Sequence, residues 1–334
     1  MHQSIPMLMA SSLAGMPEFV EAELGAGAMR RAFCDSGLPV DTPRREGNFI
    51  PEIGMMMFLD SAARQSGEEH LGALLGLSLD IANYGTWGRY VLEGRTLGDC
   101  LSRFEKSADC FFNYPGFRVS VSGDLAWVQH AWATSQHLKV NHLGLGSVGA
   151  IINIVRHYVG PEFLPTVAEI DVPRPVTKAR LEEWLPFDMV YRAPQFRLAF
   201  PRDLLNTPRR AAVDGVPITL SDVRRRSNSN DPTNLPDAMR EIVRLQVLSG
   251  RPNLDAAARS LNMNTRTLQR ALDREGVGFR DLSQHVRMDM ALNLILETDL
   301  PLADVSKSLG YSDPFNFSRA FLRQHGRRPS DFRL

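Results

Sequence analysis

The feature that most constrains the fold of this chain is a repeat near its C-terminal end. Segments 254–272 and 302–321 each contain a short run with one apolar face, a tight turn and a second such run. The first run of each copy begins and ends on leucine, at Leu254, Leu261, Leu302 and Leu309. Each copy therefore predicts a helix-turn-helix, and a repeat of roughly 48 to 50 residues leaves room for one connecting helix.

In the second helix of the first copy, Leu268 and Leu272 are four residues apart and mark the face that packs inward. Arg266, Gln269 and Arg270 fall on another face of the same helix. Arginine can contact guanine O6 and N7 with two donors, and glutamine can pair with adenine N6 and N7. We expect these three residues to read bases in a major groove, with a solvated polar face as the alternative.

The second copy shows a similar arrangement after Asp313, a predicted N-cap followed by Pro314 at the first helical position. Phe317 and Phe321 replace the two leucines as the inward pair. The candidate DNA contacts of this copy are Phe315 at a thymine methyl group, Asn316 and Arg319 at base edges, and Arg323 at a phosphate.

Between the copies, the apolar spacing predicts one helix from Phe279 to Leu296. A helix of about 18 residues spans about 27 Å, and one turn of DNA is about 34 Å long. Two reading helices on such a spacer can enter adjacent major grooves on one face of DNA. We therefore expect one asymmetric DNA site for each monomer.

Charge alone does not predict a nucleic-acid partner. The formal net charge of the chain is zero, and residues 237–334 hold 15 lysine and arginine against 12 aspartate and glutamate residues. The prediction therefore rests on where the arginines lie. No apolar run approaches the ~20 residues of a membrane helix, and no charged leader precedes the first apolar run, so we expect a cytoplasmic protein. The three cysteines (Cys34, Cys100 and Cys110) fit buried or half-buried free thiols.

The chain before the repeat predicts an α+β domain joined to the all-α C-terminal domain. Its first 110 residues favour helices, and alternating apolar residues at 117–122 and 125–132 predict a β-hairpin. The further predicted elements are helices at 50–63, 97–112, 143–158 and 180–185 and strands at 167–172 and 196–200. We interpret 1–207 as an effector-binding and dimerisation domain, the polar, Arg-rich stretch 208–235 as a linker, and 236–334 as the DNA-binding domain.

A literal G-x-G-x-x-G occurs at Gly144, Gly146 and Gly149, with Glu169 about 20 residues later. Polar residues precede it and no series of βαβ units surrounds it, so we favour glycines that let a helix pack closely against a sheet over a dinucleotide site. His130, His137 and His142 have poor spacing for zinc. We expect no cofactor, metal or catalytic residue. An enzyme or nucleotide-binding protein with an appended DNA-binding domain, and an architectural DNA binder that senses nothing, are the alternatives.

Residues 235–334 resemble the DNA-binding domain of AraC/XylS-type transcriptional regulators. Segments 305–312, 317–321 and 326–333 carry most of the resemblance, and Asn262 stands where such domains more often have glycine. Asparagine tolerates a positive φ, so this difference leaves the expectation intact.

The N-terminal part resembles, through 144–160 and 186–200, the effector domain of the AraC relatives that regulate ornithine use and virulence. The resemblance implies a bacterial activator that binds promoter DNA, a small-molecule effector and RNA polymerase, and that forms homodimers. It does not name the effector or settle activation against repression. Six aromatic residues could line an effector pocket, although core packing is the alternative for them: Tyr84, Trp87, Phe111, Phe112, Trp127 and Trp132.

Overall fold

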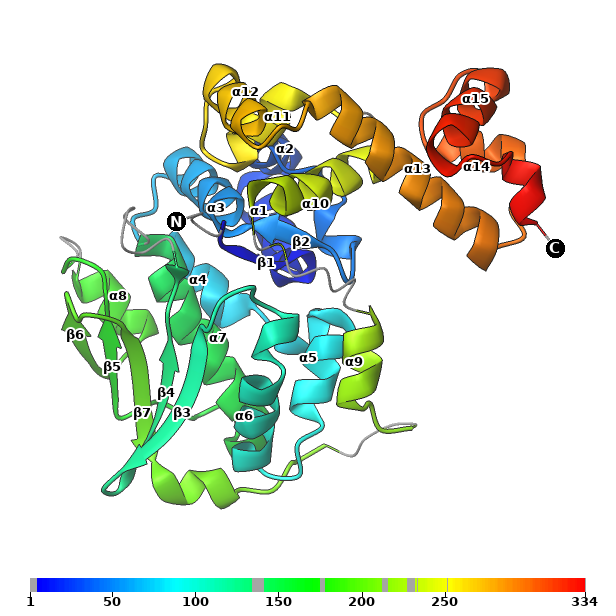
Figure 1. Ribbon diagram of the computed structural model, residues 1–334. Coiled ribbons are helices and arrows are strands. Elements are labelled where there is room, and N and C mark those ends of the chain that lie inside the picture. The colour runs from blue at the N-terminus through cyan, green and yellow to red at the C-terminus, as the bar shows by residue number, and fades with distance from the viewer. Residues whose placement is uncertain are drawn as a thin grey trace.

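The structure, a computed structural model, describes residues 5–133, 141–174, 178–211, 216–226, 232, 234–250 and 252–333 (Figure 1). The described residues form two main hydrophobic cores, one in the N-terminal part and one around the C-terminal repeat. An α+β N-terminal domain and a helical C-terminal domain confirm the predicted fold class. No helix in these ranges is long and apolar enough to cross a membrane.

The N-terminal domain begins with a two-stranded antiparallel sheet and continues with helices. Strands β1 and β2 are Met7–Met9 and Phe49–Pro51. The helices are α1 Met16–Leu24, α2 Ala26–Ser36, α3 Glu52–Ser66, α4 Leu71–Ser78, α5 Gly85–Leu92 and α6 Leu97–Lys106. The helix predicted at 50–63 starts later because Ile50 and Pro51 belong to β2. The helix predicted at 97–112 ends at Lys106, and a short 3-10 turn follows at Ala108–Cys110.

A five-stranded sheet forms the other layer of this domain, in the order β3-β4-β7-β5-β6. Its strands are β3 Phe117–Ser122, β4 Leu125–His130, β5 Val167–Ile170, β6 Asp188–Tyr191 and β7 Phe196–Pro201, and only β5 and β6 pair in parallel. The predicted hairpin is confirmed, with Ser122 opposite Leu125. Helices α7 and α8 are Asn141–Val159 and Lys178–Trp184.

The three glycines of the G-x-G-x-x-G motif lie inside α7, so they form no phosphate-binding loop. A Cβ atom on Gly149 would stand 2.3 Å from the backbone carbon of Gly76, and one on Gly76 would stand 2.3 Å from the carbonyl oxygen of Gly146. Gly146 and Gly149 therefore let α7 pack against helix α4, and the prediction that they pack against a sheet was wrong. Gly144 faces the side chain of Val172, which follows β5.

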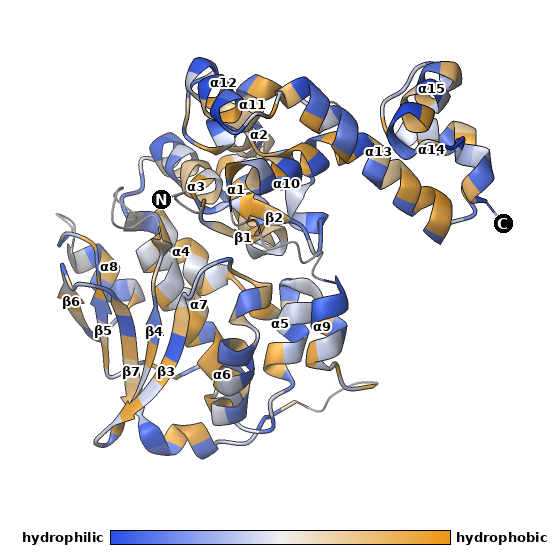
Figure 2. Cartoon of the chain, in the orientation of Figure 1, coloured by the Kyte–Doolittle hydropathy of each residue, from blue (hydrophilic) through white to orange (hydrophobic). Residues whose placement is uncertain are grey.

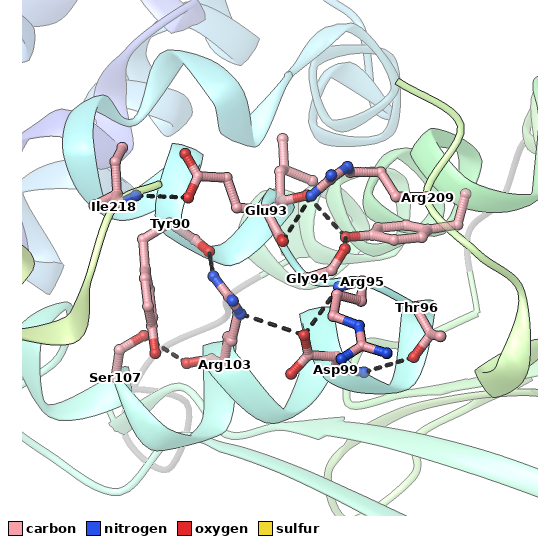
Figure 3. Close-up of polar contacts among 12 residues, drawn as sticks. Tyr90, Glu93, Gly94, Arg95, Thr96, Asp99, Arg103, Ser107, Arg209 and Ile218 are labelled. Atoms are coloured by element: carbon pink, nitrogen blue, oxygen red, sulfur yellow. Dashed lines mark hydrogen bonds and ion pairs between the residues drawn. The ribbon is translucent and has the colours of Figure 1, made fainter. Parts of the chain in front are cut away.

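The segment interpreted as a linker is partly packed on the N-terminal domain. Within it, α9 (Leu220–Arg226) lies against α5 and buries Val223. Figure 3 shows the polar contacts that hold the start of this segment: the Arg209 guanidinium donates to the carbonyl oxygen of Glu93 at 2.7 Å, and the Ile218 amide donates to the Glu93 carboxylate at 2.7 Å. Arg224, Arg225 and Arg226 each form an ion pair with a carboxylate of this chain.

The C-terminal domain consists of helices around one long helix (Figure 1). Its helices are α10 Leu235–Leu248, α11 Leu254–Ser260, α12 Thr265–Arg274, α13 Phe279–Glu297, α14 Leu302–Ser308 and α15 Pro314–His325, and a 3-10 turn, η7, follows at Pro329–Phe332. Both predicted helix pairs and the connecting helix are confirmed. Figure 1 shows α11 and α12 near one end of α13 and shows α14 and α15 further along this helix. The side chain of Gln324 in α15 contacts His285 and Asp289, which lie in the middle of α13.

Candidate nucleic-acid interface

The first helix-turn-helix unit (residues 254–274) is held by a tight turn and by side-chain caps. Asn262 has a φ of 52°, which lets the chain turn between α11 and α12. The Asn264 side chain then caps α12 by accepting from the Thr267 amide at 2.8 Å. Leu268 and Leu272 are buried, as the spacing predicts. Their burial fixes which face of α12 points to solvent, and Figure 2 shows this helix mostly in hydrophilic colours.

The second unit (residues 302–325) uses a glycine where the first uses asparagine. Gly310 has a φ of 80°, and the Asp313 carboxylate caps α15 by accepting from the Phe315 amide at 2.8 Å. Pro314 occupies the first helical position, as predicted. Phe317 and Phe321 are fully buried, with their ring centroids 5.9 Å apart.

Each predicted DNA contact residue is exposed in the structure. On α12 these residues are Arg266, Gln269 and Arg270, and on α15 they are Phe315, Asn316, Arg319 and Arg323. Phe315 is 80 % exposed, which is unusual for a phenylalanine. This exposure agrees with the predicted contact to a thymine methyl group. The Arg319 guanidinium donates to the Asn316 side-chain oxygen at 2.6 Å, so these two candidate readers form one polar group. The structure places the seven residues on two separate helices, α12 before the start of α13 and α15 beside the middle of α13.

The second unit is fastened to α13 by specific polar contacts. Gln284 of α13 donates to the Tyr311 hydroxyl at 2.9 Å, and Gln324 of α15 donates to the Asp289 carboxylate at 2.9 Å. The Arg287 guanidinium lies 5.7 Å from the centroid of the Tyr311 ring. These contacts hold the second unit in place on α13.

The first unit packs against the N-terminal domain, a contact that the sequence did not predict. A Cβ atom on Gly37 would stand 2.2 Å from the carbonyl oxygen of Ala256 in α11. The Arg259 guanidinium donates to the carbonyl oxygen of Cys34 at 3.1 Å. A groove of about 740 Å³ lies beside this contact, lined by residues of α1, α2, α10 and α11.

Helix α10 completes this contact through a buried carboxylate, Glu241. Its Oε2 atom accepts from the Asn48 side chain and the Phe49 amide, each at 3.4 Å. Burial raises the pKa of Glu241, although the Arg244 guanidinium, 3.7 Å from its other oxygen, and the two hydrogen bonds oppose this shift. A glutamate among the apolar residues Met239, Ile242 and Val243 is a signal that sequence reasoning could have used. The close approach at Gly37 leaves no such local signal.

The cysteines, histidines and aromatic residues singled out from the sequence lie in different places. Cys34 is exposed at the edge of the interdomain groove, whereas Cys100 and Cys110 are buried free thiols. The prediction of a buried or half-buried thiol was therefore wrong for Cys34. His130 and His142 both line one cavity of the N-terminal domain, and His137 lies outside the described residues. Five of the six aromatic candidates line that same cavity, and Trp127 instead stacks against Arg197.

Comparison with known proteins agrees with this architecture. Residues 27–209 match the arabinose-binding domain of the AraC transcription regulator, N-terminal, and residues 257–334 match a helix-turn-helix domain family. The chain is similar to the ornithine utilization regulator of Pseudomonas aeruginosa, with 27 % identity over 299 residues that cover 84 % of this chain and 85 % of the relative.

Two further similarities are more limited. The urease operon transcriptional activator of Escherichia coli is 39 % identical over 82 residues, which cover 25 % of this chain and 28 % of the relative. The crystal structure of the transcriptional regulator CdpR from Pseudomonas aeruginosa matches 78 % of this chain and 85 % of its own, at 22 % identity and a TM-score of 0.37. Since the family match of the N-terminal domain alone covers more than half of the sequence, the chain belongs to the AraC family of DNA-binding transcription regulators.

Proposed function

We propose that this protein is a transcriptional activator controlled by a small-molecule effector, and that its two helix-turn-helix units enter adjacent major grooves of one promoter site. The supporting observation is the exposure of both reading helices, α12 before the start of α13 and α15 beside its middle. Helix α13 has 19 residues and is therefore about 28 Å long. This length is comparable with the ~34 Å between successive major grooves on one face of DNA.

The contact between the first unit and the N-terminal domain supports effector control. Helix α11 packs against α2 and α3, and α10 packs against β2. A change of shape in the N-terminal domain would therefore act directly on the position of α12. We propose that the effector changes the affinity for DNA or the spacing of the two units by this route.

Footprinting of the full-length protein on an operator selected from random DNA tests the two-groove arrangement. We expect protection of two adjacent major grooves on one face. Arg270→Ala should remove base discrimination in one groove and Arg319→Ala in the other, each at a cost of about 1–3 kcal/mol for the cognate base. Arg118→Ala, an exposed arginine on β3 far from the repeat, is the control and should leave the footprint unchanged.

The result of this experiment distinguishes an arginine that contacts bases from one that contacts phosphates. Loss of affinity by the same factor on every DNA sequence would make the mutated arginine a phosphate anchor, since phosphates carry no sequence information. A footprint confined to one groove in the parent protein would contradict the two-groove proposal itself.

We also propose a homodimer and contact with RNA polymerase, on the basis of family membership. Sedimentation of the full-length protein with and without operator DNA tests the dimer, and a monomer under both conditions would refute it. Transcription in vitro with purified polymerase tests activation. A fall in transcript on addition of the protein would identify a repressor instead.

A further inference from the structure

A cavity in the middle of the N-terminal domain has the construction of a ligand site. It has a volume of about 90 Å³, well above the ~10–15 Å³ that one water molecule needs. Helix α7 supplies more of its lining residues than any other helix, and aromatic side chains close one side. This side includes Phe112, whose ring centroid lies 5.0 Å from that of His130, and Trp132, whose ring centroid lies 4.4 Å from that of His130.

The lining of the cavity includes polar atoms without partners. His130 is only 7 % exposed, and its Nε2 atom has no hydrogen-bond partner in the described part of the chain. The Nδ1 atom of His142, which lines the same cavity, is also buried and unpaired among the described residues. The buried hydroxyl of Ser12, which lines the cavity as well, donates a long hydrogen bond of 3.7 Å to the Met55 sulfur. Buried polar atoms are nearly always hydrogen-bonded in folded proteins, so the two unpaired imidazole nitrogens favour a bound molecule as their partner.

The charge of this lining selects the class of ligand. Among the lining residues that the structure describes, none is Asp, Glu, Lys or Arg. Burial lowers the pKa of His130 to about 3, so its imidazole is neutral at pH 7. A carboxylate or an ammonium group in this cavity would lose its water shell without gaining an opposite charge, which is strongly unfavourable.

The cavity is also connected to the DNA-binding domain. Met55 and Leu59 of α3 line it, and Gly54 of the same helix lies against α11, where an added Cβ atom would stand 3.3 Å from the carbonyl oxygen of Ser260. Leu8 of β1 lines it as well, and β1 pairs with β2, which contacts α10. Helix α3 therefore touches both the cavity and the first helix-turn-helix unit, and β1 connects the cavity to α10 through β2.

We propose that this cavity is the effector site, and that the effector is a neutral, largely apolar molecule with a single hydrogen-bonding group that meets His130. The inference rests on the proposed effector control and names the ligand class for it. A neutral effector would differ from a charged amino acid such as ornithine, which the name of the similar ornithine utilization regulator contains.

Calorimetric titration of the full-length protein with matched pairs of probes tests the ligand class. The neutral probes are benzyl alcohol and hexan-1-ol, and the charged probes are benzoate, hexanoate and ornithine. We expect saturable binding of at least one neutral probe, at least tenfold tighter than binding of its carboxylate counterpart. Binding of ornithine or a carboxylate in preference to the alcohols, or no saturable binding of either alcohol, would overturn the proposal.

Two variants and a control locate the site. His130→Phe keeps a ring but removes both nitrogens, and it should weaken binding of the alcohol by about tenfold, the usual effect of one lost hydrogen bond. Ala150→Leu enters the cavity from α7 and should weaken every neutral probe, which provides a second test if the first variant folds poorly. Trp127→Phe lies on the same strand as His130 but outside the lining, and should leave binding unchanged. Unchanged alcohol binding in folded His130→Phe and Ala150→Leu proteins would contradict this location.

Footprinting with and without the alcohol distinguishes the failure of this inference from the failure of the proposed function. A two-groove footprint that ornithine alters and the alcohols do not would retain effector control and reject the ligand class. A footprint that no probe alters, combined with binding of an alcohol at His130, would support the site and reject its control of DNA binding.

Discussion

The two helix-turn-helix units have the same local design but different surroundings. The first packs its α11 against α2 and α3, with Gly37 in backbone contact with Ala256. For the second, the hydrogen bonds and ion pairs of the described residues reach only α13 and the unit itself. The comparison shows that one motif can have two kinds of surroundings. The first unit contacts the N-terminal domain, whereas the second is held by α13 and lies close to the end of α10, where a Cβ atom on Gly310 would stand 3.2 Å from the carbonyl oxygen of Gly250.

The difference also indicates how one bound effector would change the positions of both α12 and α15. Because α13 continues from the first unit and carries the second, a rotation of α11 on the N-terminal domain would be transmitted along the length of α13. The second unit needs no contact of its own with the N-terminal domain. Under the proposed effector control, a change at the first unit would then also change the position of α15 relative to the N-terminal domain.

The largest expected effect comes from breaking the second unit alone. Phe317→Ala removes a buried ring that contacts Tyr311 and Phe321, and should destabilise this unit by about 3–5 kcal/mol. Hydrogen exchange followed by mass spectrometry should show faster exchange in α14 and α15 while α11 and α2 keep their protection. Equal loss of protection in α11 would mean that the units fold as one, contrary to the comparison. Phe315→Ala on the same helix, at an exposed position, is the control.

A smaller effect comes from releasing the first unit. Gly37 and Gly67 have nearly equal φ values, 68° and 66°, but a Cβ atom on Gly67 would have no neighbour within 4 Å. Gly37→Ala and Gly67→Ala therefore share the backbone strain of about 1 kcal/mol and differ in the contact with α11. We expect Gly37→Ala to lose about 1–3 kcal/mol more, because the α2–α11 packing must separate. Urea unfolding measures the difference, and equal losses in the two variants would show that the packing is dispensable.

The comparison also marks which part of the structure could be predicted from the sequence. Each helix-turn-helix is encoded within about 20 consecutive residues by apolar spacing, caps such as Asp313 and turn residues such as Asn262, so local reasoning found both units. The contact with DNA of the seven predicted residues stays a prediction, although their exposure agrees with it.

The partner surfaces could not be predicted in this way. Gly37 and Gly54 are meaningful only because α11 lies against them, and Gly149 only because α4 supplies Gly76. Such close approaches depend on residues far away in the chain and leave no periodic signal. The cavity was partly foreseen through its aromatic residues, but the spacing of Trp127 and Trp132 on one hairpin does not by itself distinguish the cavity side of the sheet from the other.

The smallest expected effect concerns the pH dependence of the contact between α10 and β2. Burial raises the pKa of Glu241 above its ordinary value of 4.5, so the folded state binds this proton more tightly than the unfolded state does. A raised pKa contributes stability that is complete below the unfolded-state value and is lost as pH rises through the folded-state value. Glu241→Gln keeps an acceptor oxygen for Asn48 and Phe49 but cannot ionise, so it should flatten this fall. Urea midpoints measured from pH 4.5 to pH 8 check the sign, with exposed Glu297→Gln as the control. A parent curve that rises across this range, with the same slope in Glu241→Gln, would mean that the buried carboxylate does not control the docking of the first unit.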